Sequence, residues 1–283
     1  MPLPLAEPVA QHAPAMAITI DDIPWNAGHP QGYDWLAATR RLTAALVERQ
    51  IPATGFVNCD RVSSQAPIKI WTDAGFELGN HADTHMDLSS NPLEKWTEDV
   101  RRCDARLREW TGRLRWFRYP YLHQGETIAK RDGAYAALET LGVRVAQVSI
   151  DNEEWRLAAG YAKAEPIAQV KIAAAYVQHF RDASQHFREL ATAKAGREIK
   201  HVLLLHANML AADHLGSALD ALRDDGWQFI PLDEAMADPV YALPDVYTST
   251  FGPSWLHRIE PVLPDEFAWE KQQEAFAKAV VGD

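Results

Sequence analysis

The chain has 283 residues, of which 47% are hydrophobic and 24% charged, so it can bury a substantial core as one large domain or two small ones. It carries 28 basic and 39 acidic residues, and the resulting net charge of −11 argues against nucleic acid or an anionic membrane surface as its main partner. No stretch approaches the length of a membrane-spanning helix, so we expect no membrane insertion.

The first 15 residues are rich in proline and alanine but lack the basic and apolar regions of a complete signal peptide. We therefore expect a soluble chain that is cytoplasmic or, if a signal peptide has been removed, periplasmic or secreted. The two cysteines, Cys59 and Cys103, are too few for a disulfide framework, and neither has a metal-type cysteine partner nearby. We interpret both as ordinary thiols.

Short apolar runs alternate with longer amphipathic stretches along the chain. Seven runs have strand character: 16–20, 53–57, 76–78, 114–117, 143–150, 201–205 and 227–230. Helical patterns cover 34–49, 66–74, 92–110, 126–141, 167–189, 213–224 and 265–280. Strands that alternate with helices indicate an α/β protein with a parallel sheet.

Seven such strands predict a barrel of TIM type that is short of one strand, and an open doubly wound sheet is the main alternative. No glycine-rich phosphate loop follows the first strand, which lowers the expectation of nucleotide binding. We expect one catalytic domain over residues 1–283. Its core would span about 15–235, and a C-terminal extension, 239–283, would pack on that core.

Polar side chains gather where the predicted strands end, which is where chemistry is found in a parallel barrel. Asp21 and Asp22 end the first strand, and two carboxylates this close repel each other unless a cation lies between them. A metal would resolve this by binding one carboxylate and leaving the other free as a base. His81 and His85 follow the third strand, and a four-residue spacing on one helical turn would place both rings on the same face. Two histidines and one carboxylate, with a water in the fourth position, are typical of a catalytic metal site.

Three further strand ends carry candidate residues. Arg118, next to a free carboxylate, would lower the pKa of that group and hold it ionised. His206 follows an apolar run and is a candidate general acid if it faces the same site. Either Asp151 or Glu154 could orient His206 and raise its pKa.

Together, these segments resemble the motifs of the polysaccharide deacetylases, the NodB-homology domain of carbohydrate esterase family four. The family pattern reads T-F-D-D, H-(S/T)-x-x-H, R-x-P-Y, D-x-x-D-W and L-x-H, in that order. The matching segments here are Thr19-Ile20-Asp21-Asp22, His81-Ala82-Asp83-Thr84-His85, Arg118-Tyr119-Pro120-Tyr121, Asp151-Asn152-Glu153-Glu154-Trp155 and Leu204-Leu205-His206. The resemblance spans about residues 15–235, most of the chain.

The resemblance implies a distorted (β/α) barrel of about seven parallel strands. It also implies a metal-dependent hydrolase that removes an N-acetyl or O-acetyl group from a sugar, oligosaccharide or polysaccharide, with one divalent ion, most commonly zinc. Carried onto this sequence, it assigns the following roles: Asp21 is the general base; Asp22, His81 and His85 bind the metal; Arg118 holds Asp21; the backbone N–H of Tyr121 stabilises the oxyanion; His206 protonates the leaving amine; Glu154, or else Asp151, orients His206.

The sequence departs from the family pattern at a few positions. Ile23 replaces the usual glycine after the paired aspartates, Ala82 replaces a hydroxyl residue, and Glu154 stands where the family has aspartate. These changes bear more on substrate than on reaction. One alternative is a C–N hydrolase of the same barrel type that acts on a small amide or cyclic imide. Another is a carbohydrate-binding relative that has lost turnover, against which the intact Asp21, Arg118 and His206 argue.

Overall fold

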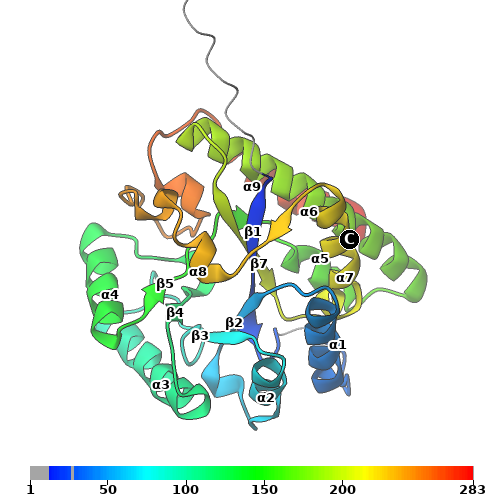
Figure 1. Cartoon of the computed structure of the whole chain (residues 1–283), viewed down its shortest axis with the longest axis horizontal. Coiled ribbons are helices and arrows are strands. Elements are labelled where there is room, and N and C mark those ends of the chain that lie inside the picture. The colour runs from blue at the N-terminus through cyan, green and yellow to red at the C-terminus, as the bar shows by residue number, and fades with distance from the viewer. Residues whose placement is uncertain (1–12, 27–28, 283) are drawn as a thin grey trace, which may run out of the picture.

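The structure is a computed structural model that describes residues 13–26 and 29–282, so most of the proline- and alanine-rich start of the chain lies outside the described residues. Short strands occupy the centre of the molecule and helices surround them (Figure 1). The strands, which are paired in parallel, are β1 (Ala15–Ile23), β2 (Ala53–Val57), β3 (Glu77–Asn80), β4 (Trp116–Phe117), β5 (Arg144–Val145), β6 (Ile150–Asp151), β7 (Lys200–His206) and β8 (Gln228–Phe229).

The sheet curls into a distorted barrel, as predicted. Its strands are joined in the order β5-β4-β3-β2-β1-β7-β6, and β8 pairs with the start of β1. The two ends of this order, β5 and β6, are consecutive in the chain. Between them, Ala146 N–H donates to Phe117 O (2.8 Å) and Ser149 N–H donates to Val202 O (3.1 Å). The run 143–150 was predicted as one strand, but it divides in two because its first half pairs with β4 and its second half reaches β7.

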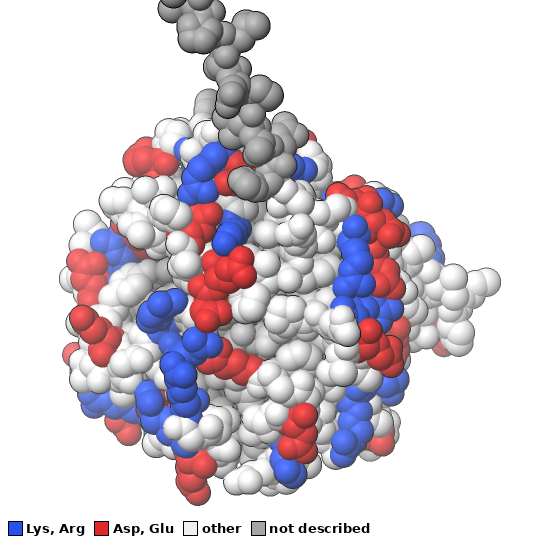
Figure 2. All heavy atoms as spheres, viewed as in Figure 1, with Lys and Arg blue, Asp and Glu red and all other residues white. Residues whose placement is uncertain are grey.

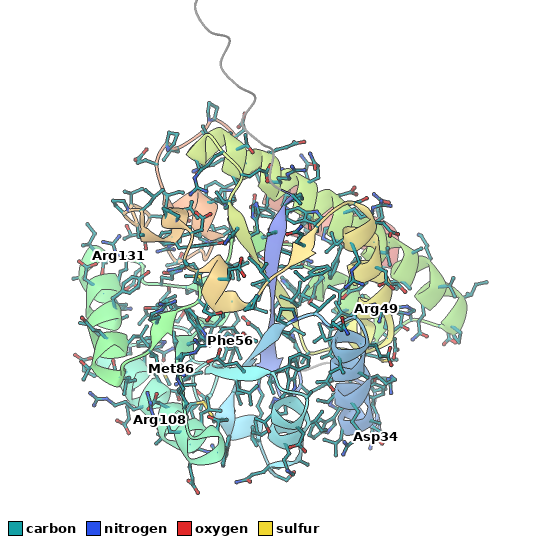
Figure 3. All side chains as sticks on the ribbon, viewed as in Figure 1. Asp34, Arg49, Phe56, Met86, Arg108 and Arg131 are labelled. Atoms are coloured by element: carbon teal, nitrogen blue, oxygen red, sulfur yellow. A yellow bond between two sulfur atoms is a disulfide. The ribbon has the colours of Figure 1, made fainter. Side chains whose placement is uncertain are left out.

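The helices follow the predicted pattern, with two additions. They are α1 (Trp35–Glu48), α2 (Ala66–Asp73), α3 (Leu93–Thr111), α4 (Ile128–Leu141), α5 (Trp155–Tyr161), α6 (Pro166–Ala195), α7 (Met209–Asp224), α8 (Leu232–Ala235) and α9 (Ala268–Val281). The short helices α5 and α8 were not predicted, because four to seven residues give too little periodicity to detect. Asp34 accepts a hydrogen bond from Ala37 N–H at the start of α1, and Arg49 follows its other end (Figure 3).

Alternation along the strands divides the side chains between the barrel interior and the helices. On β1, Met16, Ile18 and Ile20 belong to the large core cluster that also contains buried residues of the surrounding helices. Ala17 instead packs in a second cluster with side chains of β2, β4, β7 and α8, namely Phe56, Trp116, Val202, Leu232 and Ala235. The period of two therefore directs Ala17, Thr19 and Asp21 toward the interior.

The C-terminal segment packs on the barrel. Helix α9 contacts α5 and α6, and Val281 lies against Gly160, where an added Cβ would come within 2.2 Å of the Val281 side chain. Trp255, Leu256 and Ile259 are buried in the same large cluster as the outer faces of the strands. The segment after α8 is thus continuous with the main hydrophobic core.

Charged side chains of both signs lie next to one another on the face shown in Figure 2. Many are paired, as in Arg49–Asp220 (2.7 Å) and Lys200–Glu234 (3.0 Å). The excess of acidic residues is therefore not gathered into one acidic field on this face. None of the helices in the described part of the chain combines the length and the apolarity that crossing a membrane requires.

The interpretation of both cysteines as ordinary thiols was wrong, because Cys59 and Cys103 form a disulfide. Cys59 begins the 3₁₀ turn η1 (Cys59–Arg61), which follows β2, and Cys103 lies on the buried side of α3. Packing of α3 against η1 brings their Cα atoms to 5.3 Å although 44 positions separate them in sequence. Sequence spacing carries no sign of this contact, which depends on the tertiary packing of two elements.

We expect the disulfide to contribute strongly to stability. In the chain-entropy model, a cross-link that closes a loop of 44 residues stabilises the folded state by about 4 kcal/mol, because it restricts the unfolded chain. The double variant Cys59→Ala/Cys103→Ala should therefore unfold at lower urea concentration than the oxidised wild type. Adding a thiol reductant should shift the wild type toward the double variant and leave the double variant unchanged. Equal midpoints for all four samples would contradict the cross-link.

Candidate active site

The inward-facing sides of β1 and β7 bring two predicted residues together. In the β1–β7 register, Asp21 pairs with His206, and both residues lie at the C-terminal ends of their strands. Both line a pocket of about 470 Å³ that opens at this end of the barrel. Nine more of the residues named in the sequence analysis line the same pocket: Asp22, His81, His85, Tyr119, Tyr121, Asp151, Glu153, Trp155 and Leu204.

A bulge in β1 lets two consecutive aspartates face the same pocket. The pairing of β1 with β2 shifts between Ile20 and Ile23, and Asp22 has a positive φ of 65°. Ile20 and Ile23 both belong to the large core cluster described above. The extra residue turns Asp22 back toward the side on which Asp21 lies, whereas a regular strand would direct the two carboxylates to opposite faces.

Asp22, His81 and His85 form a compact group of potential metal ligands, with one donor atom of each residue within 4.8 Å of the others. The Nε2 atom of His85 is 3.5 Å from Asp22 Oδ1, and that of His81 is 3.9 Å from the same oxygen. In the described part of the chain no other group of three histidine, cysteine or acidic side chains meets this spacing.

The two histidines converge through an irregular loop, and the predicted helical turn between them is not present. Ala82 and His85 adopt positive φ angles of 64° and 58°. The loop is fastened from both sides: Asn58 Nδ2 donates to His81 O (2.6 Å), and Thr84 donates through N–H and Oγ1 to Asp99 of α3 (both 3.0 Å). The convergence of the rings is therefore set by tertiary hydrogen bonds and not by helical spacing.

The donor set fits a divalent ion such as zinc. His81 Nδ1–H donates to Arg118 O (2.9 Å), which leaves Nε2 as the free donor atom, directed toward Asp21 and Asp22. Burial lowers the pKa of His81 well below its ordinary value and also lowers the pKa of His85, so both rings are neutral, as metal ligands must be. Burial disfavours the charged form of Asp22, but the combined attraction of the surrounding groups that can carry positive charge, the histidines together with Arg61, outweighs burial and lowers the pKa of Asp22.

Arg118 lies inside the barrel, where it supports Asp21. Its Nη1 is 3.3 and 3.4 Å from the two carboxylate oxygens of Asp21, its Nε donates to Ala146 O (2.8 Å) and its Nη2 donates to Thr19 Oγ1 (3.0 Å). The guanidinium carbon lies 4.6 Å from the ring centre of Phe56, which occupies the middle of the barrel (Figure 3). Every edge of the guanidinium is thus held in place.

Arg118 lowers the pKa of Asp21, as predicted, but burial of the carboxylate outweighs this effect. Burial raises the pKa of Asp21 to about 6, and the opposing effects of Arg118 and His206 are smaller. The direction of the arginine's effect was predicted correctly, but the degree of burial cannot be seen in the sequence. A carboxyl group with this pKa is ionised at neutral pH and is a stronger base than an exposed aspartate.

Glu154 is the acidic residue in contact with His206. Its Oε1 accepts a hydrogen bond from His206 N–H (2.6 Å) and lies 3.3 Å from the ring Nδ1. Its Oε2 is 3.5 Å from Nδ2 of Asn208, and its side chain is completely buried. Burial alone would lower the pKa of His206, but the Glu154 carboxylate raises it to about 9. The ring is therefore protonated at neutral pH.

Asp151 lies in the same pocket but interacts more weakly with His206. Burial, together with the charge of Glu153, raises the pKa of Asp151 to about 7, and His206 opposes this only in part. Glu153 itself pairs with Arg156 (2.6 Å), whose guanidinium lies over Trp155 at 4.4 Å. The contact geometry thus separates the two acids that the sequence left as alternatives.

Tyr121 occupies a tight turn at the pocket mouth, η2 (Pro120–Leu122). Tyr121 and Leu122 both have positive φ angles, 57° and 55°, which residues other than glycine rarely adopt. The Tyr121 side chain is 57% exposed, and its ring lies edge-on to His85 with a centroid distance of 4.5 Å. The ring of Tyr121 therefore lies beside one of the potential metal ligands, at the mouth of the pocket.

Arg61, Phe251 and Gly252 are three of the pocket residues that were not found from the sequence. Arg61 of η1 donates from Nη1 to Asp22 Oδ1 (3.2 Å), so the disulfide at Cys59 holds in place a turn that contacts a potential ligand. Phe251 and Gly252, from the C-terminal segment, also line the pocket. None of the three follows a predicted strand, and no local pattern distinguishes them from other loop residues.

Comparisons with known proteins agree with this fold. A family model described as polysaccharide deacetylase matches residues 9–144, just under half of the chain. No curated protein sequence matches the chain. A chitin deacetylase from the fungal pathogen Colletotrichum lindemuthianum is 19% identical, with a TM-score of 0.58 over 83% of this chain and 94% of that one. The peptidoglycan deacetylase PdaC from Bacillus subtilis is 21% identical, with a TM-score of 0.53 over 80% of this chain and 93% of that one.

A third similar structure is described as a pseudoenzyme of carbohydrate esterase family four from Bacillus anthracis. It is 16% identical, with a TM-score of 0.57 over 79% of this chain and 66% of that one, and a mutant of it is described as having restored enzymatic activity. Similar folds thus include both deacetylases and a pseudoenzyme, and at these identities the structural likeness shows the fold alone. The sequence match, the order of the motifs and the curled parallel sheet agree, and residues 9–144 of the chain match the polysaccharide deacetylase family.

Proposed function

We propose that this chain is a metal-dependent hydrolase that removes acetyl groups from an N-acetylated or O-acetylated carbohydrate. One observation carries the proposal: a carboxylate base and a protonated histidine, Asp21 and His206, are neighbours in one pocket with a separate group of potential ligands. Ligand binding alone requires neither a buried base nor a buried acid. The arrangement therefore favours turnover over the inactive binding protein that the pseudoenzyme relative makes possible.

In the proposed reaction, Asp22, His81 and His85 hold one divalent ion, most commonly zinc. Such an ion supplies Lewis acidity toward the acetyl carbonyl and makes an attacking water more acidic. Asp21 accepts the proton of that water, and Arg118 keeps the carboxylate in position through contacts to both oxygens.

The reaction also requires a general acid for the leaving group and a hydrogen-bond donor that stabilises the developing oxyanion. His206, held protonated by Glu154, donates a proton to the leaving nitrogen or oxygen. The backbone N–H of Tyr121 stabilises the oxyanion, because the rigid turn η2 brings this peptide to the pocket mouth. A base with a pKa near 6 and an acid with a pKa near 9 are both in their active forms at neutral pH.

Acetate release across a panel of substrates tests the proposal. The zinc-loaded protein should release acetate from N-acetylglucosamine oligomers or from O-acetylated oligosaccharides, and the chelated protein should not. Ring opening of a cyclic imide without acetate release would instead support a C–N hydrolase of the same fold. Binding of the sugars without turnover, in zinc-loaded protein, would support the inactive relative.

We expect zinc binding to depend on the three potential ligands and not on the neighbouring histidine. Asp22→Ala, His81→Ala and His85→Ala should each lose the stoichiometric zinc that the wild type binds, because three protein ligands are the usual minimum of a catalytic site. His123→Ala is the matched control, since His123 lines the same pocket but pairs with Asp87 (2.8 Å). Elemental analysis after dialysis gives the answer, and zinc retained by all three ligand variants would rule out this site.

The disulfide supports an extracytoplasmic location. Structural disulfides persist in oxidising compartments and are rare in the cytoplasm of ordinary organisms. Cys59 and Cys103 are both fully buried, which suits a structural role better than redox catalysis. We therefore favour the periplasm or the cell exterior, where acetylated polysaccharides are also accessible.

A further inference from the structure

A closed loop of the C-terminal segment reaches the pocket. The loop, Val246–Arg258, is joined at its ends by a hydrogen bond from Val246 N–H to Arg258 O (2.8 Å). The Arg258 side chain is 1% exposed and fills the inside of the loop, where Nη2 donates to Asp245 Oδ2 (2.6 Å) and to Tyr247 O (3.2 Å). Because its two ends lie close together and its interior is filled by a side chain, the segment is a compact Ω-type loop.

The same loop is fastened to the barrel. Trp255 N–H donates to Val148 O (2.5 Å), in the connection between β5 and β6, and the Trp255 indole donates to Val240 O (2.8 Å). Trp255 is buried. The loop therefore moves with the barrel, and the residues at its tip have fixed positions relative to the pocket.

At its tip, Gly252 lies directly against the turn that carries Tyr121. A Cβ atom added at Gly252 would be 2.1 Å from Tyr121 O and 2.5 Å from the carbonyl carbon of Leu122. Both are backbone atoms of the pocket mouth, and both belong to residues with strained, positive φ angles. Gly252 does not itself have a positive φ, so this close approach is what requires glycine there.

Beside Gly252, Phe251 presents an aromatic ring at the edge of the pocket. Its side chain is 45% exposed, although its other side faces Phe267 with a centroid distance of 6.0 Å. Tyr121 and Trp155 line the same pocket and are 57% and 40% exposed. Phe251 thus adds a third partly exposed aromatic ring, and this one comes from outside the family motifs.

We propose that the loop Val246–Arg258 is a working part of the active site, in which Gly252 positions the Tyr121 peptide and Phe251 binds a sugar ring next to the acetylated one. The inference rests on the proposed function, because it assigns the loop to that site. The flat, rigid ring of Phe251 suits the apolar C–H face of a pyranose and costs little conformational entropy to order. The loop thereby adapts this chain to an acetylated oligosaccharide longer than one sugar.

Gly252→Ala tests the positioning role. The added methyl group must displace the Tyr121–Leu122 backbone, so kcat should fall at least about tenfold, because small misplacements of a positioning group are costly. Zinc content should stay at the wild-type level, since the three potential ligands are not touched. Thr250→Ala is the matched control, because Thr250 is exposed, belongs to the same loop and is not part of the pocket lining. Unchanged kcat in a folded, zinc-replete Gly252→Ala variant would overturn this role.

Phe251→Ala tests the binding role, also in the event that Gly252→Ala does not fold. We expect KM, and the dissociation constant measured by calorimetry, to rise about tenfold for the N-acetylglucosamine trimer, consistent with the loss of one aromatic contact. The change for N-acetylglucosamine itself should be smaller, and Phe251→Trp should restore trimer binding. A general structural defect would weaken both ligands equally and would not be rescued by tryptophan.

The outcomes separate the loop from the reaction. Trimer binding that depends on Phe251, in a wild type without acetate release, would refute the proposed hydrolysis and support the loop. Acetate release from the trimer with identical KM values in wild type, Phe251→Ala and Thr250→Ala would refute the binding role and leave the proposed hydrolysis intact. A wild type that neither binds nor hydrolyses any member of the panel would overturn both.

Discussion

Replacing Asp21 with asparagine should reduce kcat by a factor on the order of 10² or more while leaving the fold and the zinc content unchanged. Asparagine keeps the shape of the side chain and can still contact Arg118 but cannot accept a proton. Asp21 lies beside the potential ligands without belonging to the group of three. Its carboxylate is buried and has its pKa raised to about 6, which suits a base that works at neutral pH.

The measurement is steady-state acetate release, with zinc content and circular dichroism recorded for the same samples. Asp60→Asn is a suitable control, because Asp60 is an exposed carboxylate of the nearby turn η1. A kcat close to that of the wild type in Asp21→Asn would move the base elsewhere, and Glu154 would be the next residue to test. Loss of zinc in Asp21→Asn would show instead that Asp21 is itself a ligand.

The parts of the fold that could be predicted depend on local patterns. Short apolar runs separated by amphipathic stretches were enough to predict the parallel barrel, because alternation of strands and helices restricts the topology. The same alternation explains why Ala17, Thr19 and Asp21 line the interior. It could not show that the run 143–150 divides between two neighbours, since the partner of a strand is a tertiary choice.

The candidate site, like the fold, could be predicted from the sequence only in part. Polar residues at strand ends predicted which side chains would meet, and the pocket brings together Asp21, Asp22, His81, His85 and His206. The means of meeting could not be predicted, because the β1 bulge and the irregular His81–His85 loop are fixed by contacts with β2 and α3. The disulfide and the contact of Gly252 with Tyr121 join segments that are far apart in sequence, and no spacing rule brings them together.

The choice between Glu154 and Asp151 as the partner of His206 can now be stated as an expected pH profile. His206 must be protonated to act as the acid, so kcat/KM should fall as the pH rises through its pKa of about 9. Glu154→Gln removes the carboxylate that opposes the effect of burial. The basic limb should then move to lower pH, because the pKa of the ring falls. Asp151→Asn should leave this limb close to its wild-type position. His206 is hydrogen-bonded to Glu154, whereas Asp151 interacts with it only by longer-range charge attraction.

Stability should respond to the same ion pair with a defined sign. The folded-state pKa of His206 is raised above the value of about 6.5 for an unfolded chain, so the pair stabilises the fold fully below pH 6.5. This contribution is lost as the pH rises toward 9, and in Glu154→Gln it should be absent throughout. Urea unfolding of the wild type and Glu154→Gln at pH 6 and pH 9 measures this contribution to stability. The dependence of kcat/KM on pH in Glu154→Gln and Asp151→Asn measures the pKa of the catalytic acid. A basic limb that moves in Asp151→Asn and stays in place in Glu154→Gln would make Asp151 the orienting acid.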